Sequence, residues 1–133
     1  MVDSVDYHKW MNRAAQDLRT IENNFKDDPE FLASVNCYLA QQAAEKLLKA
    51  FLLSHEIHLP KTHDLMFLFK SCIDIQAEFQ PIKEPLEILN LYAIEARYPG
   101  DFFDQITAVQ GQEAYEAVSR VRELVEGMLL GTS

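Results

Sequence analysis

The sequence is short of the residues that build disulfide-rich domains, zinc sites and phosphate-binding loops. It has two cysteines, Cys37 and Cys72, and both lie within apolar stretches, so no disulfide framework is expected. Neither has a second cysteine or a histidine at the spacing of zinc ligands. The four glycines do not cluster, which excludes a Gly-rich phosphate loop. We predict two buried thiols, no metal site and no cofactor.

Long apolar runs and an excess of positive charge are also missing. No apolar stretch approaches the ~20 residues of a membrane helix, and the first residues lack the basic and apolar segments of a secretion signal. We therefore expect a cytoplasmic protein with no membrane association. The net charge of −9 repels phosphate backbones and disfavours broad, non-specific nucleic-acid binding. With 133 residues and 48% hydrophobic content, we predict a single domain over residues 1–133.

Apolar residues recur at steps of three and four along most of the chain, a spacing typical of amphipathic helices. No alternating stretch of useful length predicts a strand. The pattern predicts five helices, which cover approximately residues 7–25, 29–55, 63–79, 85–97 and 112–130. Because short connections favour antiparallel neighbours, we predict an all-α, up-and-down bundle of four main helices plus an additional helix.

The second helix is predicted to be central, because its apolar positions wrap widely and its middle is rich in alanine. Ser4, Asp28 and Thr62 precede the first three helices and are predicted as their N-caps. The segment from Asp101 to Gln110 is predicted to be a loop. The predicted core includes Trp10, Leu39, Leu47, Phe51, Leu68 and Leu89, and Leu91 is placed on the apolar face of the fourth helix.

Glu45 is the charged residue of greatest interest, because it stands in the middle of the long helix beside Lys46. At the surface it would belong to an ordinary polar stripe. If the helix is as buried as its alanines suggest, Glu45 needs a cationic partner such as an arginine. Arg13 and Asp17, four residues apart, are interpreted as a pair within the first helix.

Three histidines, His55, His58 and His63, lie around the connector that follows the long helix. Three imidazoles near one loop are a possible metal site. Their spacing is loose and Pro60 interrupts the segment, which favours plain surface histidines. His63 is expected to help orient the start of the third helix.

Three segments together resemble the HEPN domain family. Residues 10–18, WMNRAAQDL, are similar to its opening helix, and residues 95–100, EARYPG, are similar to its Arg-Tyr-Pro turn. The most specific match is residues 37–50, CYLAQQAAEKLLKA, which continues through Leu53 to KTHDL at residues 61–65. The resemblance implies a bundle of four main helices and a short one, similar to the substrate-binding subunits of nucleotidyltransferases, and often a homodimer.

Many members of the family lie beside a small nucleotidyltransferase in a toxin–antitoxin-like module, and some are ribonucleases. The ribonuclease motif is an arginine, a polar residue directly after it, and a histidine after four to six residues. Here Arg97 is followed by Tyr98, and no histidine occurs after His63. The motif is not matched, the group that would handle the ribose 2′-hydroxyl proton is absent, and we predict no catalytic residue.

The resemblance leads us to predict nucleotide or partner binding at Arg97, Tyr98, Glu45 and His63, and an interface at Phe102 and Phe103. Three functions remain open. The first is a non-catalytic binding module that is the helical partner of a small nucleotidyltransferase and contributes to nucleotide binding. The second is a divergent ribonuclease toxin that uses Arg97 and an unusual partner residue. The third is a structural homodimer with an unknown ligand.

Overall fold

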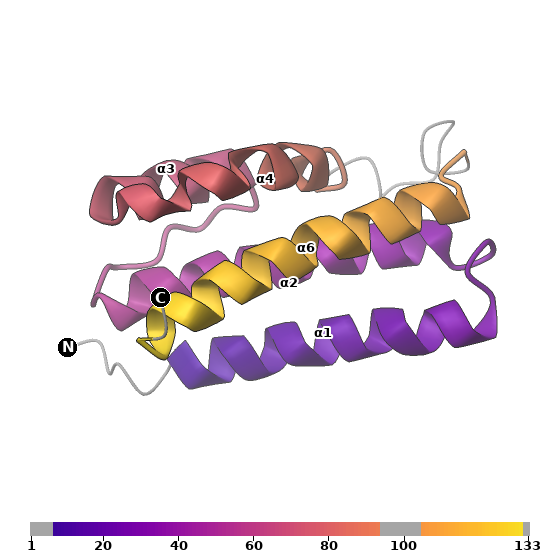
Figure 1. Ribbon diagram of the computed structural model, residues 1–133, viewed down its shortest axis with the longest axis horizontal. Helices are drawn as coiled ribbons and strands as arrows, with labels where there is room; N and C mark the ends of the chain where they lie inside the picture. Colours follow the sequence, from indigo (N-terminus) through magenta and orange to yellow (C-terminus); the bar gives the residue numbers. More distant parts are fainter. Residues whose placement is uncertain (1–6, 94–104, 132–133) are drawn as a thin grey trace.

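A computed structural model describes residues 7–93 and 105–131 of the chain (Figure 1). Within these ranges the protein is helical and contains no strand. The elements are α1 (Tyr7–Asp27), α2 (Ala33–Ser54), α3 (Leu65–Ile75), the 3-10 helix η2 (Ala77–Ile82), α4 (Lys83–Asn90) and α6 (Ala108–Leu129). The prediction of an all-α bundle is confirmed.

Helix α2 is the centre of the bundle and packs against α1, α3, α4 and α6 (Figure 1). Its alanines Ala40, Ala43 and Ala44 are fully buried. Small side chains at these positions allow neighbouring helices to approach closely. The start of α1 lies beside the end of α2, so these two long helices run antiparallel. The predicted central position of the second helix is confirmed.

The connector of residues 55–64 returns along α2 before α3 begins (Figure 1). Gln41, in the middle of α2, donates a hydrogen bond to the backbone oxygen of His63 at 3.2 Å. The connector therefore brings His63 back to the level of Gln41 and Glu45, more than two helical turns before the end of α2. This return places a loop histidine beside the polar residues of the central helix.

Four of the six predicted core residues, Leu47, Phe51, Leu68 and Leu89, are buried. The prediction was wrong for Trp10 and Leu39, which are only half-buried. Both lie at the edge of the bundle, where one side of the residue packs inward and the other meets solvent. It was also wrong for Leu91, which follows the last residue of α4 and is 55% exposed.

The helix starts differ from those predicted at three places. Helix α2 begins at Ala33 rather than Pro29, because Asp28 caps only a preceding turn by accepting a bond from the Phe31 N–H. The N-cap of α3 is Asp64, which accepts from Met66 N–H at 2.9 Å, and not Thr62. Helix α6 begins within the predicted loop at Ala108, where Thr107 and Gln110 form a capping box. Ser4 lies outside the described residues.

Cys37 and Cys72 are free and buried, as predicted. Among residues 7–93 and 105–131, no helix has the length and apolar character required to cross a membrane.

Candidate functional site

Glu45 is a buried carboxylate in the middle of α2, with only 5% of its surface exposed. Its Oε1 lies 2.8 Å from His63 Nδ1, and its Oε2 accepts a hydrogen bond from Lys49 Nζ at 3.0 Å. A buried charge is tolerated only when it is paired and hydrogen-bonded. The predicted need for a cationic partner is confirmed, although Lys49 fills that role instead of an arginine.

Lys49 is itself buried and is covered by the only tryptophan of the chain. Its ammonium nitrogen lies 5.6 Å from the centroid of the Trp10 ring. That distance allows a cation–π attraction, which strengthens when the cation is desolvated. Trp10 reaches Lys49 because α1 starts where α2 ends. The half-exposed indole thus forms one wall of the site.

His63 is held at both its backbone and its side chain. Gln41 fixes the backbone oxygen, and the Gln41 side-chain oxygen in turn accepts a bond from Gln42 at 2.7 Å. A carboxylate has no hydrogen to donate, so the bond to Glu45 places the ring proton on Nδ1. The His63 side chain is 56% exposed, which leaves Nε2 available to a ligand.

The end of the connector is fixed to α4 immediately after His63. The Asn90 side-chain oxygen accepts a hydrogen bond from Leu65 N–H at 2.8 Å, and its nitrogen donates to Asp64 Oδ1 at 3.1 Å. The backbone that carries His63 is therefore tied to α2 on one side and to α4 on the other. A histidine on such a support has a well-defined position although it lies in a loop.

A second ion pair joins α1 and α2 close to the pair of Glu45 and Lys49. Lys46 Nζ donates to Asp17 Oδ2 at 2.7 Å, so the predicted pair of Asp17 with Arg13 is wrong. Arg13 is exposed and stands three residues after Trp10 and four before Asp17, which places it on the same face of α1. We call Trp10, Arg13, Lys46, Lys49 and His63, with the carboxylates of Asp17 and Glu45, the polar cluster.

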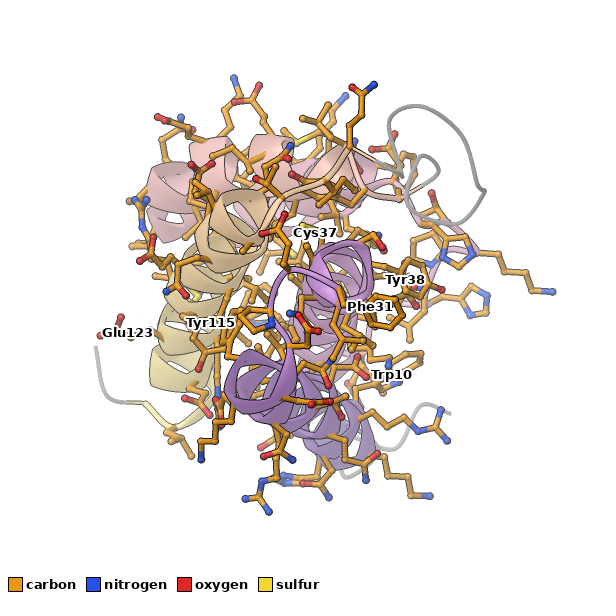
Figure 2. The ribbon with its side chains drawn as sticks, turned by 90° about the vertical axis from the view of Figure 1, so that its right-hand side faces the viewer. Trp10, Phe31, Cys37, Tyr38, Tyr115 and Glu123 are labelled. Atoms are coloured by element: carbon orange, nitrogen blue, oxygen red, sulfur yellow. The ribbon has the colours of Figure 1, made fainter. Side chains whose placement is uncertain are left out.

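The polar cluster carries three permanent positive charges and two carboxylates, in a chain whose net charge is −9. It is thus locally positive on an acidic protein. Figure 2, an end-on view, shows Trp10, Tyr38 and Phe31 on the same side of the bundle. Tyr38 is half-buried, and Phe31 is exposed. Of these three aromatic residues, Trp10 contacts a basic group of the polar cluster, Lys49.

The other histidines of the connector do not join His63 in a metal site. The ring of His55 lies against that of Phe51, with centroids 4.6 Å apart. Across the described parts of the chain, no three His, Cys, Asp or Glu side chains are grouped as ligands for a metal ion. The thiols are equally unsuited to chemistry at neutral pH, because burial raises the pKa of Cys37 to about 11 and that of Cys72 to about 12.

Of the predicted site residues, Glu45 and His63 are in contact, whereas Arg97, Tyr98, Phe102 and Phe103 lie outside the described residues. Sequence reasoning missed Lys49, although its position four residues after Glu45 is the spacing of a helical ion pair. It also missed Gln41 as a support for His63. The role of Trp10 as a cover for Lys49 follows only from the antiparallel packing of α1 on α2.

Comparisons with known proteins agree with this architecture. The structure is similar to that of an archaeal HEPN homologue, ST0689, with a TM-score of 0.74, 20% sequence identity, and coverage of 92% of this chain and 96% of that one. It is also similar to the protein TT1696 from Thermus thermophilus, with a TM-score of 0.75, 22% identity, and coverage of 91% and 96%. No curated protein matches the sequence.

At these identities the two solved structures establish the fold alone. The sequence itself matches the model of the HEPN domain over residues 7–128, which is nearly all of the chain. The matched region contains the whole polar cluster and every described helix except the final residue of α6. The chain belongs to the HEPN domain family.

Proposed function

We propose that this HEPN domain is a non-catalytic binding module, the helical partner of a small nucleotidyltransferase in a toxin–antitoxin-like system. The observation that supports the proposal is the buried ion pair of Glu45 and Lys49 beneath Trp10. Replacing a buried ion pair by apolar residues is often neutral or stabilising, so stability alone gives little reason for it. Binding gives such a reason, because Glu45 holds the exposed His63 and Lys49 contacts the half-exposed Trp10.

The ligand proposed for the polar cluster is a single nucleotide, bound alone or together with the partner enzyme. The half-exposed face of Trp10 offers a surface on which a base stacks. Arg13 offers donors for phosphate oxygens, because a guanidinium can bind two oxygens at once. His63 Nε2 offers an acceptor for a ribose hydroxyl. Arg97 and Tyr98 are proposed to complete the site. The net charge of −9 favours a small ligand over a long nucleic acid.

The single tryptophan makes this proposal directly testable, because intrinsic fluorescence then reports on Trp10 alone. We expect ATP, GTP, CTP or UTP to quench that fluorescence saturably, with the chain alone or mixed with a tryptophan-free variant of a small nucleotidyltransferase. His63→Asn and Arg13→Gln should each weaken binding at least about fivefold, a loss of about 1 kcal/mol. Arg19→Gln, an exposed arginine elsewhere on α1, is the matched control. The nucleotide site would be refuted if all three variants bound nucleotide with equal affinity, or if no nucleotide bound to the chain, alone or mixed with the enzyme.

The nucleotidyltransferase partnership is tested separately by measuring association of the two purified proteins without nucleotide. We expect a stable complex in analytical ultracentrifugation, weakened by Trp10→Ala. Two independently sedimenting species at high micromolar concentration would exclude the partnership while leaving nucleotide binding by the chain alone open.

We further propose that the module is a homodimer, with Tyr98, Phe102 and Phe103 in the interface. Closed two-fold pairs are the commonest soluble oligomers. Phe31 and Val35, which are four residues apart in the sequence, add apolar surface, since they are 78% and 40% exposed. Light scattering should report twice the monomer mass. A monomer at high micromolar concentration would remove this proposal.

A divergent ribonuclease is the second candidate, favoured by the contact between Glu45 and His63. With Nδ1 bound to the carboxylate, His63 Nε2 has the orientation of a general base. It would accept the proton of a ribose 2′-hydroxyl as that oxygen attacks the neighbouring phosphorus, and the 5′-oxygen would leave with a proton from water. Formation of 2′,3′-cyclic phosphate ends from a defined RNA, lost in His63→Gln, would favour this function. Intact RNA after prolonged incubation would exclude it.

A further inference from the structure

A groove on the opposite side of the bundle has no place in the proposed nucleotide site. It lies between η2 and the C-terminal half of α6 and has a volume of about 530 Å³. That volume is within the range of small-molecule sites. Glu123, one of its lining residues, lies across the bundle from Trp10 in Figure 2. The groove and the polar cluster are therefore separate surfaces.

The floor of the groove is apolar and comes from two elements. Ile82 of η2 and Leu124 and Met128 of α6 all line it. Ile82 is buried, whereas Leu124 and Met128 are only half-buried and so keep apolar surface in contact with solvent. Methionine is unbranched and adapts its shape to different ligands. The floor can thus accept an apolar body without any change in the backbone.

Gly127 is part of the α6 wall of the groove. Positions 120, 123, 124 and 127 lie on one face of α6, and all four line the groove. A glycine inside a helix is unfavourable relative to alanine. It is not needed here to end the helix, because Gly131 follows the helix with a φ of 70° and supplies the left-handed residue. Position 127 therefore contributes backbone but no side chain to the groove wall that also includes Leu124 and Met128.

The rim of the groove carries one cation and two anions. Arg120 is exposed and, among the residues that the structure describes, makes no ion pair; Arg122, two residues later, pairs with Glu126 at 3.2 Å. Glu78 and Glu123 line the same groove. A ligand with one negative charge is attracted only where that charge lies against the guanidinium, whereas the further charges of a polyanion extend toward the two carboxylates and are repelled.

We propose that this groove binds an amphipathic organic monoanion. Its carboxylate or sulfonate head pairs with Arg120, and its apolar body covers Ile82, Leu124 and Met128. Glu78 and Glu123 exclude nucleoside triphosphates from the groove, which distinguishes it from the polar cluster. The proposal is independent of the proposed function, since it uses none of the same residues.

The test uses 8-anilinonaphthalene-1-sulfonate, which joins an apolar aromatic body to one sulfonate and fluoresces when it leaves water. We expect saturable binding of one probe per chain at micromolar to sub-millimolar concentration. Decanoate should displace the probe, decanol should do so at least about tenfold less well, and ATP should not. An unsaturable signal, or displacement by ATP as effective as that by decanoate, would overturn the proposal.

Two variants distinguish the contribution of the apolar groove wall to ligand binding from that of the Arg120 charge. Gly127→Leu fills the groove and should abolish probe binding, while the urea midpoint stays equal or rises because leucine favours the helix. Arg120→Gln should weaken the binding of decanoate at least fivefold and leave the binding of decanol unchanged. Arg19→Gln is the control for loss of a surface arginine and should bind normally. Probe binding that is unchanged in both groove variants would show that the site lies elsewhere and would defeat the proposal.

Discussion

His63 Nδ1 lies 2.8 Å from Glu45 Oε1, although the two residues are 18 positions apart in the chain. The contact exists because the connector after α2 returns along that helix instead of leaving it. It joins an exposed loop residue to a buried carboxylate, so any change at Glu45 acts on both the core and the surface of the bundle.

Glu45→Gln should lower the free energy of unfolding by about 3–5 kcal/mol, because it leaves the buried Lys49 ammonium without its carboxylate. Urea denaturation followed by circular dichroism measures this change. Glu126→Gln is the matched control, since the Glu126–Arg122 pair is solvent-exposed and contributes ~1 kcal/mol or less. The double variant Glu45→Met with Lys49→Met should recover most of the loss. Equal effects of the Glu45 and Glu126 variants would contradict the buried pair.

Leu47→Ala should cost about 2–5 kcal/mol of stability, as expected for truncation of a fully packed leucine. Leu47 is 1% exposed on the central helix. Leu130→Ala, at a position that is 73% exposed, should change stability by only a few tenths of a kcal/mol. A loss below about 1 kcal/mol for Leu47→Ala would mean that α2 is not the centre of the core.

Alkaline pH should destabilise the fold through the buried thiols. The pKa of Cys72 is about 12 in the folded chain against an ordinary 9.0, so above pH 9 the unfolded chain loses the proton first. The contribution of each buried thiol to the free energy of unfolding is complete below pH 9. Above pH 9 it declines by about 1.4 kcal/mol per pH unit for each thiol, until the pH reaches the pKa of that thiol in the folded chain. Urea midpoints measured from about pH 8 to about pH 10.5 should fall, and Cys72→Ala should show a shallower decline. The same slope in the variant would exclude Cys72 as a cause.

Arg97 distinguishes a binding role from a structural one. The sequence places it at the end of a predicted helix, before Tyr98-Pro99-Gly100, where a cation can also cap free carbonyl groups. Arg97→Lys keeps the charge but loses the paired donors, and it should weaken nucleotide or partner binding roughly tenfold with little change in melting temperature. If Arg97 is instead a cap, Arg97→Ala lowers stability and leaves binding per folded molecule unchanged. Isothermal titration calorimetry and thermal denaturation of both variants decide between these roles.

Helical periodicity was sufficient to predict the long helices and the central position of α2, because Leu47 and Phe51 follow the spacing that one buried face requires. The predicted extent of the third and fourth helices was wrong, since α3 ends at Ile75, η2 follows as a separate 3-10 helix, and α4 ends at Asn90. The helix starts were harder to predict. Thr62 and Asp64 both suit an N-cap, and only the structure shows that Asp64 takes that position. The capping box of Thr107 and Gln110 was readable from the sequence and was overlooked inside a predicted loop.

The candidate site was only partly predictable, since sequence spacing describes neighbours within one helix and not between helices. Asp17 had Arg13 at favourable spacing, yet it pairs with Lys46 on α2. An exposed pair within a helix contributes a few tenths of a kcal/mol, so a partner on a packed neighbouring helix easily replaces it. The contact of Trp10 with Lys49 likewise depends on how α1 docks, which no local pattern in either segment encodes.

The packing of α1 and α6 on α2 also has a consequence for the order of folding. Residues 28–32 are the only link between α1 and α2, so this antiparallel pair closes a short loop. By contrast, the contact of Ala108 N–H with Glu30 spans 78 positions. We infer that the α1–α2 hairpin forms in the folding transition state and that α6 docks afterwards. In stopped-flow experiments, Ala14→Gly in α1 should mainly slow folding, whereas Val121→Ala in α6 should mainly accelerate unfolding. The reverse pattern would place the nucleus at α6, and the N-terminal hairpin would then depend on the last helix for its formation.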